Sequence, residues 1–348
     1  MLRNSGIDES DVALREARKS SIQHNKFMVL LKGASQRPRE VWTGSTNISE
    51  GGLFGQTNVG HWIRNEDVAA KFQTYWQLLS DDPGAAADDD RTEAREKNEK
   101  FKRDVEAIEA APATWQGIPQ GVSAVFSPRT TDAVLQMYTQ MVDQAQDLTC
   151  ITLAFGINTM FKELLQDNTA LSHLAFFLLE KEDKPNPRSS QPFIALNARN
   201  NVYKAWGSFL REPLHQWAKE TSAGNLKINQ HVSFIHSKFL LMDPLGDDPI
   251  IVSGSANFST ASTKENDENM LLIRGNQRAA DIYFSEFNRL FFHYYFRSVQ
   301  QSTLSTETDT KAASLFLDET DGWLKKYKPG SLRQKRVDVF ARMRGFQS

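Results

Sequence analysis

Apolar residues along the chain alternate between short continuous runs and longer stretches with helical spacing. The strand-like runs cover residues 26–31, 41–45, 121–129, 148–156, 174–180, 191–197, 234–243, 249–255 and 269–273. Helical spacing of apolar residues covers 66–79, 130–145 and 277–297. Because strands and helices alternate, the pattern predicts an α/β fold with a largely buried sheet.

Composition divides the chain further. Residues 80–104 switch to Pro, Gly, Ala and dense charge, which we interpret as a linker leading into an exposed helix with a solvated charged face. Four segments are therefore expected: a partial first unit at 1–80, a charged linker and helix at 81–115, a second unit at 116–300 and a C-terminal helical tail at 301–348.

The overall composition excludes several classes of protein. A chain of 348 residues with 40% hydrophobic residues can fill a proper core. With 41 Lys+Arg against 43 Asp+Glu, the net charge of -2 lacks the general attraction to polyanions of a DNA-coating protein. One cysteine, Cys150, excludes an internal disulfide. Without an apolar leader or a run of about 18 apolar residues, we expect a cytoplasmic protein with no transmembrane segment. Contact with a membrane surface stays open.

Two short motifs recur in the same order in both parts of the chain. The triplet "HNK" is followed by "GSTNIS", and "HSK" is followed by "GSANFS". The interval from histidine to asparagine is 23 residues in the first copy and 21 in the second. Two separate elements at nearly equal spacing indicate a duplicated structural unit. The shared residues are His24, Lys26, Gly44, Ser45 and Asn47 in the first copy and His236, Lys238, Gly254, Ser255 and Asn257 in the second.

The residue types of each motif point to phosphate binding. Residues two apart in a strand project from one face, so the histidine and lysine share a pocket. The continuous apolar runs beside them favour strands buried on both faces, where a lysine is costly unless an anion meets it. The following glycine permits close backbone approach, and the hydroxyl and amide can donate to anionic oxygens. Two such half-sites across a pseudo-two-fold axis would place two histidines on opposite sides of one phosphorus.

This arrangement resembles the phospholipase D superfamily, whose signature is H-x-K-x4-D followed by G-S-x-N, usually present twice. The second copy fits in full, with Asp243 at the aspartate position and Glu268 where the family commonly has the acidic residue that orients its histidine. The first copy departs twice, with Leu31 at the aspartate position and Asn58 as the counterpart of Glu268. We therefore expect Glu268 to favour a protonated His236, while an asparagine holds His24 without a charge.

The resemblance implies two repeats with mixed β-sheets flanked by helices and an active site at the pseudo-two-fold interface. It also implies phosphodiester cleavage in two steps without a metal or other cofactor. In the family the nucleophile usually belongs to the N-terminal copy, which assigns His24 as nucleophile and His236 as general acid and base. The residues expected to bind or assist the phosphate are Lys26, Lys238, Asn47, Asn257, Ser45, Ser255, Asn58, Gly44 and Gly254, with Asp243 structural.

The two copies sit unequally in the chain. More than 110 residues of α/β pattern separate the start of the second unit, near 121, from His236, whereas 23 residues precede His24. The first half is therefore expected to lack its leading strands and helices. We favour an N-terminally truncated member of the family over a layer supplied by another molecule. An unpaired edge strand would be an aggregation liability.

The substrate is open at this stage. Two motifs in one near-neutral chain favour a phospholipid headgroup, because a nuclease should show salt-sensitive attraction to polyanions. A nuclease acting on DNA or RNA is the alternative, and an inactive phosphate-binding or partner-binding module is a third. The oligomeric state is not predicted.

Other conspicuous residues receive structural interpretations. The aromatic-rich stretch 283–296 is expected in the core, and the basic stretch 325–344 is expected to be solvated, with an anionic surface as the alternative. Structural or surface roles are expected for His61, His173, His215, His231 and His293.

Overall fold

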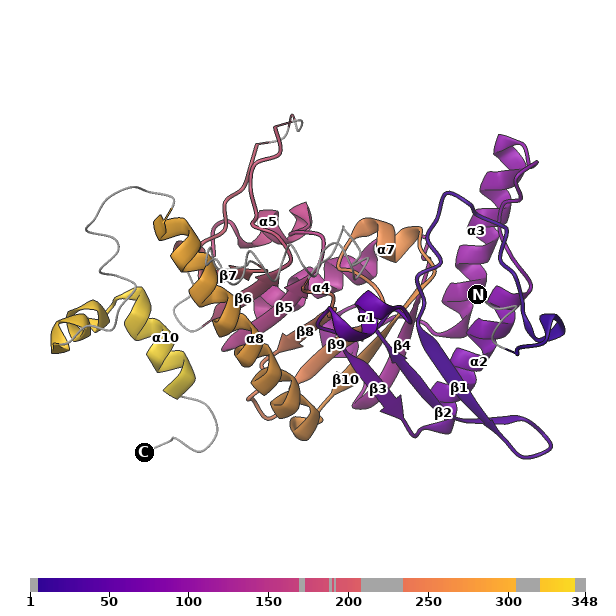
Figure 1. The fold of residues 1–348 in the computed structure, drawn as a ribbon, viewed down its shortest axis with the longest axis horizontal. Helices are drawn as coiled ribbons and strands as arrows, with labels where there is room; N and C mark the ends of the chain where they lie inside the picture. Colours follow the sequence, from indigo (N-terminus) through magenta and orange to yellow (C-terminus); the bar gives the residue numbers. More distant parts are fainter. Residues whose placement is uncertain are drawn as a thin grey trace.

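The computed structural model describes residues 6–168, 173–187, 190, 192–207, 234–304 and 320–341. Within these residues the chain builds two β-sheets that lie side by side, a small one from the N-terminal part and a large one from the rest (Figure 1). Helices cover the sheets, so the α/β class expected from the pattern of apolar residues is confirmed, and both sheets have helices packed on them.

The N-terminal part forms a three-stranded antiparallel sheet in the order β1-β2-β3. Helix α2 packs on this sheet, and α3 packs on α2 and on the neighbouring strand β4. The elements are β1 (Phe27–Lys32), β2 (Arg37–Gly44), α1 (Glu50–Phe54), β3 (Gly60–Ile63), α2 (Glu66–Ser80) and α3 (Arg91–Ile108).

The remaining chain forms a seven-stranded mixed sheet in the order β4-β10-β9-β8-β5-β6-β7. Strands β5, β6 and β7 are parallel to one another, and the other neighbouring pairs are antiparallel. The elements are β4 (Gly121–Ser127), α4 (Ala133–Gln144), β5 (Leu148–Leu153), α5 (Thr159–Leu165), β6 (Leu174–Leu179), β7 (Val202–Trp206), β8 (Phe239–Met242), β9 (Ile250–Gly254), α7 (Thr260–Lys264), β10 (Glu268–Arg274), α8 (Gln277–Leu304) and α10 (Leu332–Ala341).

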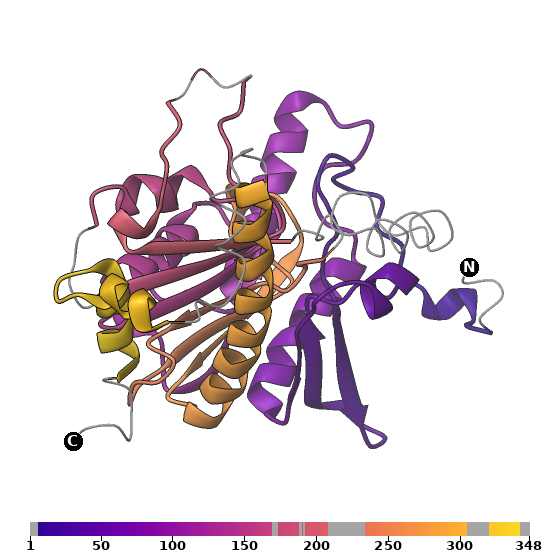
Figure 2. The ribbon, with the colours of Figure 1, turned by 60° about the vertical axis from the view of Figure 1, so that its left-hand side comes forward.

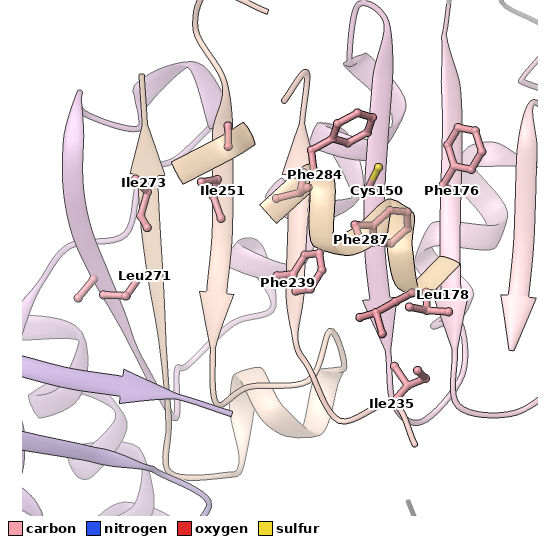
Figure 3. Close-up of a cluster of buried hydrophobic side chains, with 14 of the residues drawn as sticks. Cys150, Phe176, Leu178, Ile235, Phe239, Ile251, Leu271, Ile273, Phe284 and Phe287 are labelled. Carbon is pink, nitrogen blue, oxygen red and sulfur yellow. The ribbon is translucent and has the colours of Figure 1, made fainter. Parts of the chain in front are cut away.

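The large sheet is buried on both faces. Alternate residues of its strands face α8 on one side. Figure 3 shows this for Phe176 of β6 and Phe239 of β8, which lie on the side of the sheet that carries Phe287 of α8. The intervening residues pack against α4 and α5 on the other side. The long helix α8 crosses the sheet in Figure 2 and buries Phe284, Phe287, Phe291 and Tyr294. The core placement expected for 283–296 therefore holds for one face of the helix, whereas Phe292 and Phe296 are exposed.

The core on the α8 side is shared by the two sheets. It joins Val41 and Ile63 of the small sheet and Phe72 of α2 to Leu271 and Phe284 of the larger part. Helix α3 buries Phe101 and Val105 against this core, while most of its charged side chains form the exposed face that its charge density predicted. The shared core explains why the two sheets hold a fixed relation.

Equivalent backbone hydrogen bonds show that the two parts are structural repeats. Gly44 N donates to Lys26 O at 3.2 Å, and Gly254 N donates to Lys238 O at 3.3 Å. Ser45 N and Ser255 N each donate at 2.9 Å, to the carbonyl oxygens of Val59 and Asn269. Strands β1, β2 and β3 therefore correspond to β8, β9 and β10, and Asn58 stands where the second repeat has Glu268.

Strand β1 differs from its counterpart β8. The four residues of β8 are all buried, whereas exposure alternates along β1, leaving Met28 and Leu30 exposed. The expectation that both motif strands are buried on both faces is therefore wrong for the first. Its physical reason is that β8 has β5 beside it and α4 over it, whereas the described residues place only β2 beside β1.

Three further expectations need correction or limits. Residues 192–197 form no strand, and the edge strand is instead Val202–Trp206, which the sequence pattern did not reveal. His215, His231, most of 301–319 and residues 342–348 lie outside the described residues. In the basic stretch, Val339 of α10 is buried and Phe340 packs on the core.

The helices that the structure describes include none long and apolar enough to cross a membrane.

Asp243 has a structural role that explains its loss in the first repeat. Its carboxylate accepts backbone hydrogen bonds of 2.9, 2.9 and 3.0 Å from Gln146, Asp147 and Leu148, where β5 begins. Leu31 occupies the same position in the first repeat, where the described residues hold no strand equivalent to β5. An aspartate there would have no such backbone amides to receive.

Replacing Asp243 should therefore destabilise the fold. Asp243→Ala leaves three amides at the start of a buried strand without their acceptor, and we expect a loss of at least about 2 kcal/mol in the free energy of unfolding. Urea denaturation measures this loss. Asp247→Ala, at an exposed neighbouring carboxylate, is the control. Equal midpoints for the two variants would contradict the role given to Asp243.

Candidate active site

The two histidine motifs lie where the repeats meet. Each motif crosses to the other repeat through a parallel bridge, between Gln23 and Asp267 in one case and between Thr57 and Ile235 in the other. His24 N donates to Asp267 O at 3.0 Å, and His236 N donates to Thr57 O at 3.2 Å. Both His-x-Lys motifs thus precede β1 and β8. The expectation from sequence, that the motifs lie within those strands, is wrong.

The two imidazoles face one another. Their ring centroids are 6.3 Å apart and the planes are inclined by 76°. Reacting atoms in productive complexes approach to about 3–3.5 Å. One phosphate group between the rings is therefore within reach of both.

Each ring receives its Nδ1 partner from the opposite repeat. His24 Nδ1 lies 2.8 Å from Glu268 Oε2, and His236 Nδ1 lies 2.9 Å from Asn58 Oδ1. The expected pairing of Glu268 with His236 is therefore wrong, and so is that of Asn58 with His24. The physical reason is the bridge geometry, because each His-x-Lys segment runs beside the third strand of the other repeat.

The motif serines form hydrogen bonds with these Nδ1 partners. Ser255 Oγ donates to Glu268 Oε2 at 2.8 Å, and Ser45 Oγ donates to Asn58 Oδ1 at 2.9 Å. Each serine oxygen also accepts a backbone amide at 3.0 Å, from Asn269 and Val59 respectively. The hydroxyls thus act as positioning groups and not as the direct phosphate contacts expected from sequence.

The motif glycines are required by close strand contact. A Cβ on Gly44 would lie 2.1 Å from Val59 O, and one on Gly254 would lie 2.2 Å from Asn269 O. Such contacts are too short for any side chain, so the neighbouring strand would have to move. The glycines therefore allow β2 and β9 to carry their serines against the orienting residues.

The lysines are buried beside the histidines. Lys238 Nζ donates to His236 O at 2.7 Å, and Lys26 Nζ donates to His24 O. Burial lowers the pKa of Lys26 to about 8, although the Glu268 carboxylate opposes the shift. Burial and the nearby Lys26 lower the pKa of Lys238 to about 7. Glu268 acts on both ammonium groups, but one carboxylate does not balance two lysines and two histidines, so the cluster favours an anion.

His236 is held neutral by its surroundings. Its side chain is buried, and burial together with Lys238, Lys26 and His24 lowers its pKa to about 3, against a weaker opposing backbone hydrogen bond at Ser45. The ring of His24 is more open, with 19% of its side chain exposed. The two members of the pair are therefore chemically unequal.

The motif asparagines stand at matching places. Ser49 N donates to Asn47 O at 2.9 Å, and Ser259 N donates to Asn257 O at 2.8 Å, just before α1 and α7. The buried side-chain oxygen of Asn257 has no hydrogen-bond partner. Asn257 lines a cavity of about 150 Å³, which shares residues 154–157 with a cavity of about 550 Å³ lined by Lys162, Lys181 and Phe193.

Sequence reasoning missed the residues that join the repeats behind the site. Asp267, directly before Glu268, pairs with Arg18 at 2.6 Å and with Arg15 at 3.0 Å. Asn25 Oδ1 accepts from Asn269 at 2.7 Å. The only sequence signal was position, since Asn25, Asp267 and Asn269 lie beside residues already singled out, whereas Arg15 and Arg18 gave none.

The remaining histidines that the structure describes are separate from the site. His61 stacks on Tyr283, and burial lowers its pKa to about 4. His173 is buried beside Thr149 and Asn168. Over the described ranges, no three His, Cys, Asp or Glu side chains gather as metal ligands would.

Comparison with known proteins finds a family match over part of the chain. The family described as "Cardiolipin synthase, PLD-like domain" matches residues 194–291. No curated protein shows a significant match.

Several solved structures are similar over larger parts of the chain. Nuc from Salmonella typhimurium, a phospholipase D family member, is 15% identical with a TM-score of 0.33, covering 50% of this chain and 94% of its own. NucT from Helicobacter pylori is 12% identical with a TM-score of 0.35, covering 50% and 96%. Phosphatidylserine synthase from Haemophilus influenzae is 14% identical with a TM-score of 0.45, covering 82% and 67%.

The matched segment contains His236, Lys238, Asp243, Asn257 and Glu268, the residues on which the resemblance rested. Recognition of the phospholipase D superfamily from sequence is therefore confirmed over residues 194–291, whose sequence matches a family model of that superfamily.

Proposed function

We propose that the protein cleaves phosphodiester bonds through a phosphohistidine intermediate without a metal. The observation that supports this most strongly is the pair of imidazoles 6.3 Å apart, each with Nδ1 held by an acceptor from the other repeat. Fixing Nδ1 on both rings leaves both Nε2 atoms for chemistry, which is the arrangement that a nucleophile and a general acid need.

The reaction has two displacements at phosphorus. In the first, Nε2 of one histidine bonds to phosphorus while the ester oxygen leaves and takes a proton from the other histidine. In the second, the histidine that gave the proton takes one from water, the water oxygen bonds to phosphorus, and the bond between phosphorus and the nucleophilic histidine breaks. Lys26 and Lys238 neutralise the nonbridging oxygens, and the amides of Asn47 and Asn257 assist.

A phospholipid headgroup ester is the favoured substrate. Large apolar side chains are exposed close to the motif asparagines: Ile48, next to Asn47 in the chain, is 80% exposed, Phe54 at the end of α1 is 86% exposed and Phe155 is 65% exposed. Phe155 lines the small cavity that contains Asn257. Apolar groups at the rim of an anion site suit an amphiphilic substrate, whose acyl chains need apolar contact.

A nuclease is the second candidate. The larger cavity carries Lys162 with its Nζ 4.3 Å from the centre of the Phe193 ring, and the neighbouring Phe155 is exposed. Cations and aromatic faces next to a phosphate site also suit a single-stranded nucleic acid. The third candidate, an inactive module, rested on a missing N-terminal layer and a missing orienting acid; Glu268 supplies an acid to His24, and His236 is the ring held by an amide.

Substitution of the histidines tests the chemistry. His24→Asn and His236→Asn should each reduce turnover by about 10²-fold to 10⁴-fold or more, because each removes a nucleophile or a proton donor. His293→Asn on the exposed face of α8 is the matched control and should retain activity. A His236→Asn protein with wild-type turnover would remove the mechanism.

The same preparation, in EDTA, distinguishes the substrates. It is incubated with phosphatidylcholine vesicles, with plasmid and single-stranded DNA, and with a chromogenic phosphodiester. Choline release supports the lipid substrate, and cleaved DNA supports the nuclease. No turnover of any of these by the wild-type protein would support the inactive module and contradict the enzyme.

The buried lysines predict a pH-dependent anion affinity. Sulfate stays doubly charged from pH 6 to 10, so any change in its affinity reports the protein. The free-site pKa values of about 7 and about 8 mean that Lys238 and Lys26 are charged only below these values. Sulfate affinity should be greatest near pH 6 and fall, by up to about tenfold per pH unit for each lysine, as the pH rises through 7 and 8.

Isothermal titration calorimetry measures this fall. Lys238→Met should abolish sulfate binding and should not lower the melting temperature greatly, since burial already opposes the charge on Lys238. Lys19→Met, at an exposed lysine, is the control. An affinity that stays constant between pH 6 and pH 9 would show that these lysines do not form the anion site.

A further inference from the structure

The two catalytic rings have different partners, and this difference carries information about their roles. A carboxylate, Glu268, faces Nδ1 of His24, whereas an amide, Asn58, faces Nδ1 of His236. In a symmetric duplicated site both partners would be alike. The two roles in the proposed reaction have opposite requirements in the resting enzyme, because a nucleophile needs an unprotonated Nε2 and a general acid needs a protonated one.

The orientation of the Asn58 amide is set by its own hydrogen bonds. Its Nδ2 donates to Gly52 O at 2.7 Å, and its Oδ1 accepts from Ser45 Oγ at 2.9 Å. Turning the amide over would lose both bonds. The oxygen therefore faces His236, and that ring must carry its proton on Nδ1, which leaves a lone pair on Nε2.

Among the described residues, burial and then the neighbouring charged groups oppose a second proton on the His236 ring. The titratable groups that act on it are Lys238, Lys26 and His24, which oppose protonation, and its pKa lies at about 3. An asparagine oxygen cannot stabilise an imidazolium as a carboxylate does. A ring that is neutral at pH 7 has no proton on Nε2 to give to a leaving group.

His24 meets the opposite requirement. Glu268 is fully buried, and its Oε2 accepts from Ser255 as well as facing the ring. A carboxylate at Nδ1 gives an ionic hydrogen bond to the ring of a general acid, which the amide oxygen at His236 cannot provide. His24 is also the more open of the two rings, on the side from which a leaving group can depart.

We propose, on the basis of the proposed function, that His236 is the nucleophile and His24 is the general acid and base. This reverses the assignment expected from the order of the motifs. His236 Nε2 bonds to phosphorus as the ester oxygen leaves with the proton of His24 Nε2. His24 then takes a proton from water, whose oxygen displaces His236 from phosphorus. Asn58 is a positioning residue that keeps His236 in its nucleophilic tautomer.

Leaving groups of different basicity test the assignment. A 4-nitrophenyl phosphodiester has a leaving group that needs little protonation, whereas the choline alcohol of phosphatidylcholine needs a proton. His24→Ala should release a stoichiometric burst of 4-nitrophenol, within about tenfold of the wild-type rate, and then stall as a phosphoenzyme. The same variant should lose turnover of the choline ester. His236→Ala should give neither a burst nor a phosphoenzyme.

Mass spectrometry of the stalled protein locates the phosphoryl group. Phosphorylation of His236 in His24→Ala supports the assignment, and phosphorylation of His24 in His236→Ala overturns it. If the wild-type protein turns over phosphodiesters but the burst appears only in His236→Ala, the reaction stands and the roles are reversed. If the wild-type protein turns over no phosphodiester in the panel, the proposed function fails and the assignment falls with it.

The pH profile gives a second readout that does not require removal of a ring. Asn58→Asp would add a carboxylate beside His236 and raise its pKa, so the acidic limb of kcat/KM should move to higher pH. Glu268→Gln would remove the charge beside His24, so the alkaline limb should move to lower pH. A variant altered only in structure would lower the whole profile without moving either limb. Movement of the opposite limb in each variant would overturn the assignment.

Discussion

The active site depends on an exchange of backbone contacts between the repeats. The residue before each His-x-Lys segment forms a bridge just before the third strand of the other repeat. The histidine ring of one repeat therefore contacts the orienting residue of the other. Two consequences follow from this geometry. The ring centroids of His24 and His236 are brought to 6.3 Å, and neither repeat alone contains a histidine together with its Nδ1 partner. The shared core beneath the sheets keeps that exchange in register.

The same exchange explains what the sequence could and could not predict. The motif residues were found because their order and spacing recur, and two-residue spacing alone brings His236 and Lys238 together. The partner of each ring was assigned wrongly, because proximity along the chain favoured Glu268 for His236. A contact across a repeat interface leaves no periodic signal in one chain. Only the bridge between Gln23 and Asp267 makes it visible.

Local patterns predicted secondary structure where burial was uniform. Helix α2 and strands β6 and β10 follow the apolar runs closely, because all three face a continuous core. The apolar run at 191–197 was misleading. An apolar segment forms a strand only where a neighbouring strand is available for pairing, and the sequence pattern does not show this. Strand Val202–Trp206 was missed because it is short and contains a lysine. Aspartate at position 243 became interpretable only once the start of β5 lay beside it.

The small sheet has a consequence for synthesis on the ribosome. Its inner face, with Val41 and Ile63, is completed by Leu271 and Phe284, which are translated about 200 residues later. At typical elongation rates that interval lasts roughly 10 to 40 seconds. During it the nascent small sheet presents one apolar face that awaits its partner and another that carries Met28 and Leu30. Helix α2 can cover part of the inner face early, but the core of the N-terminal repeat is complete only after β10 and α8 have been synthesised.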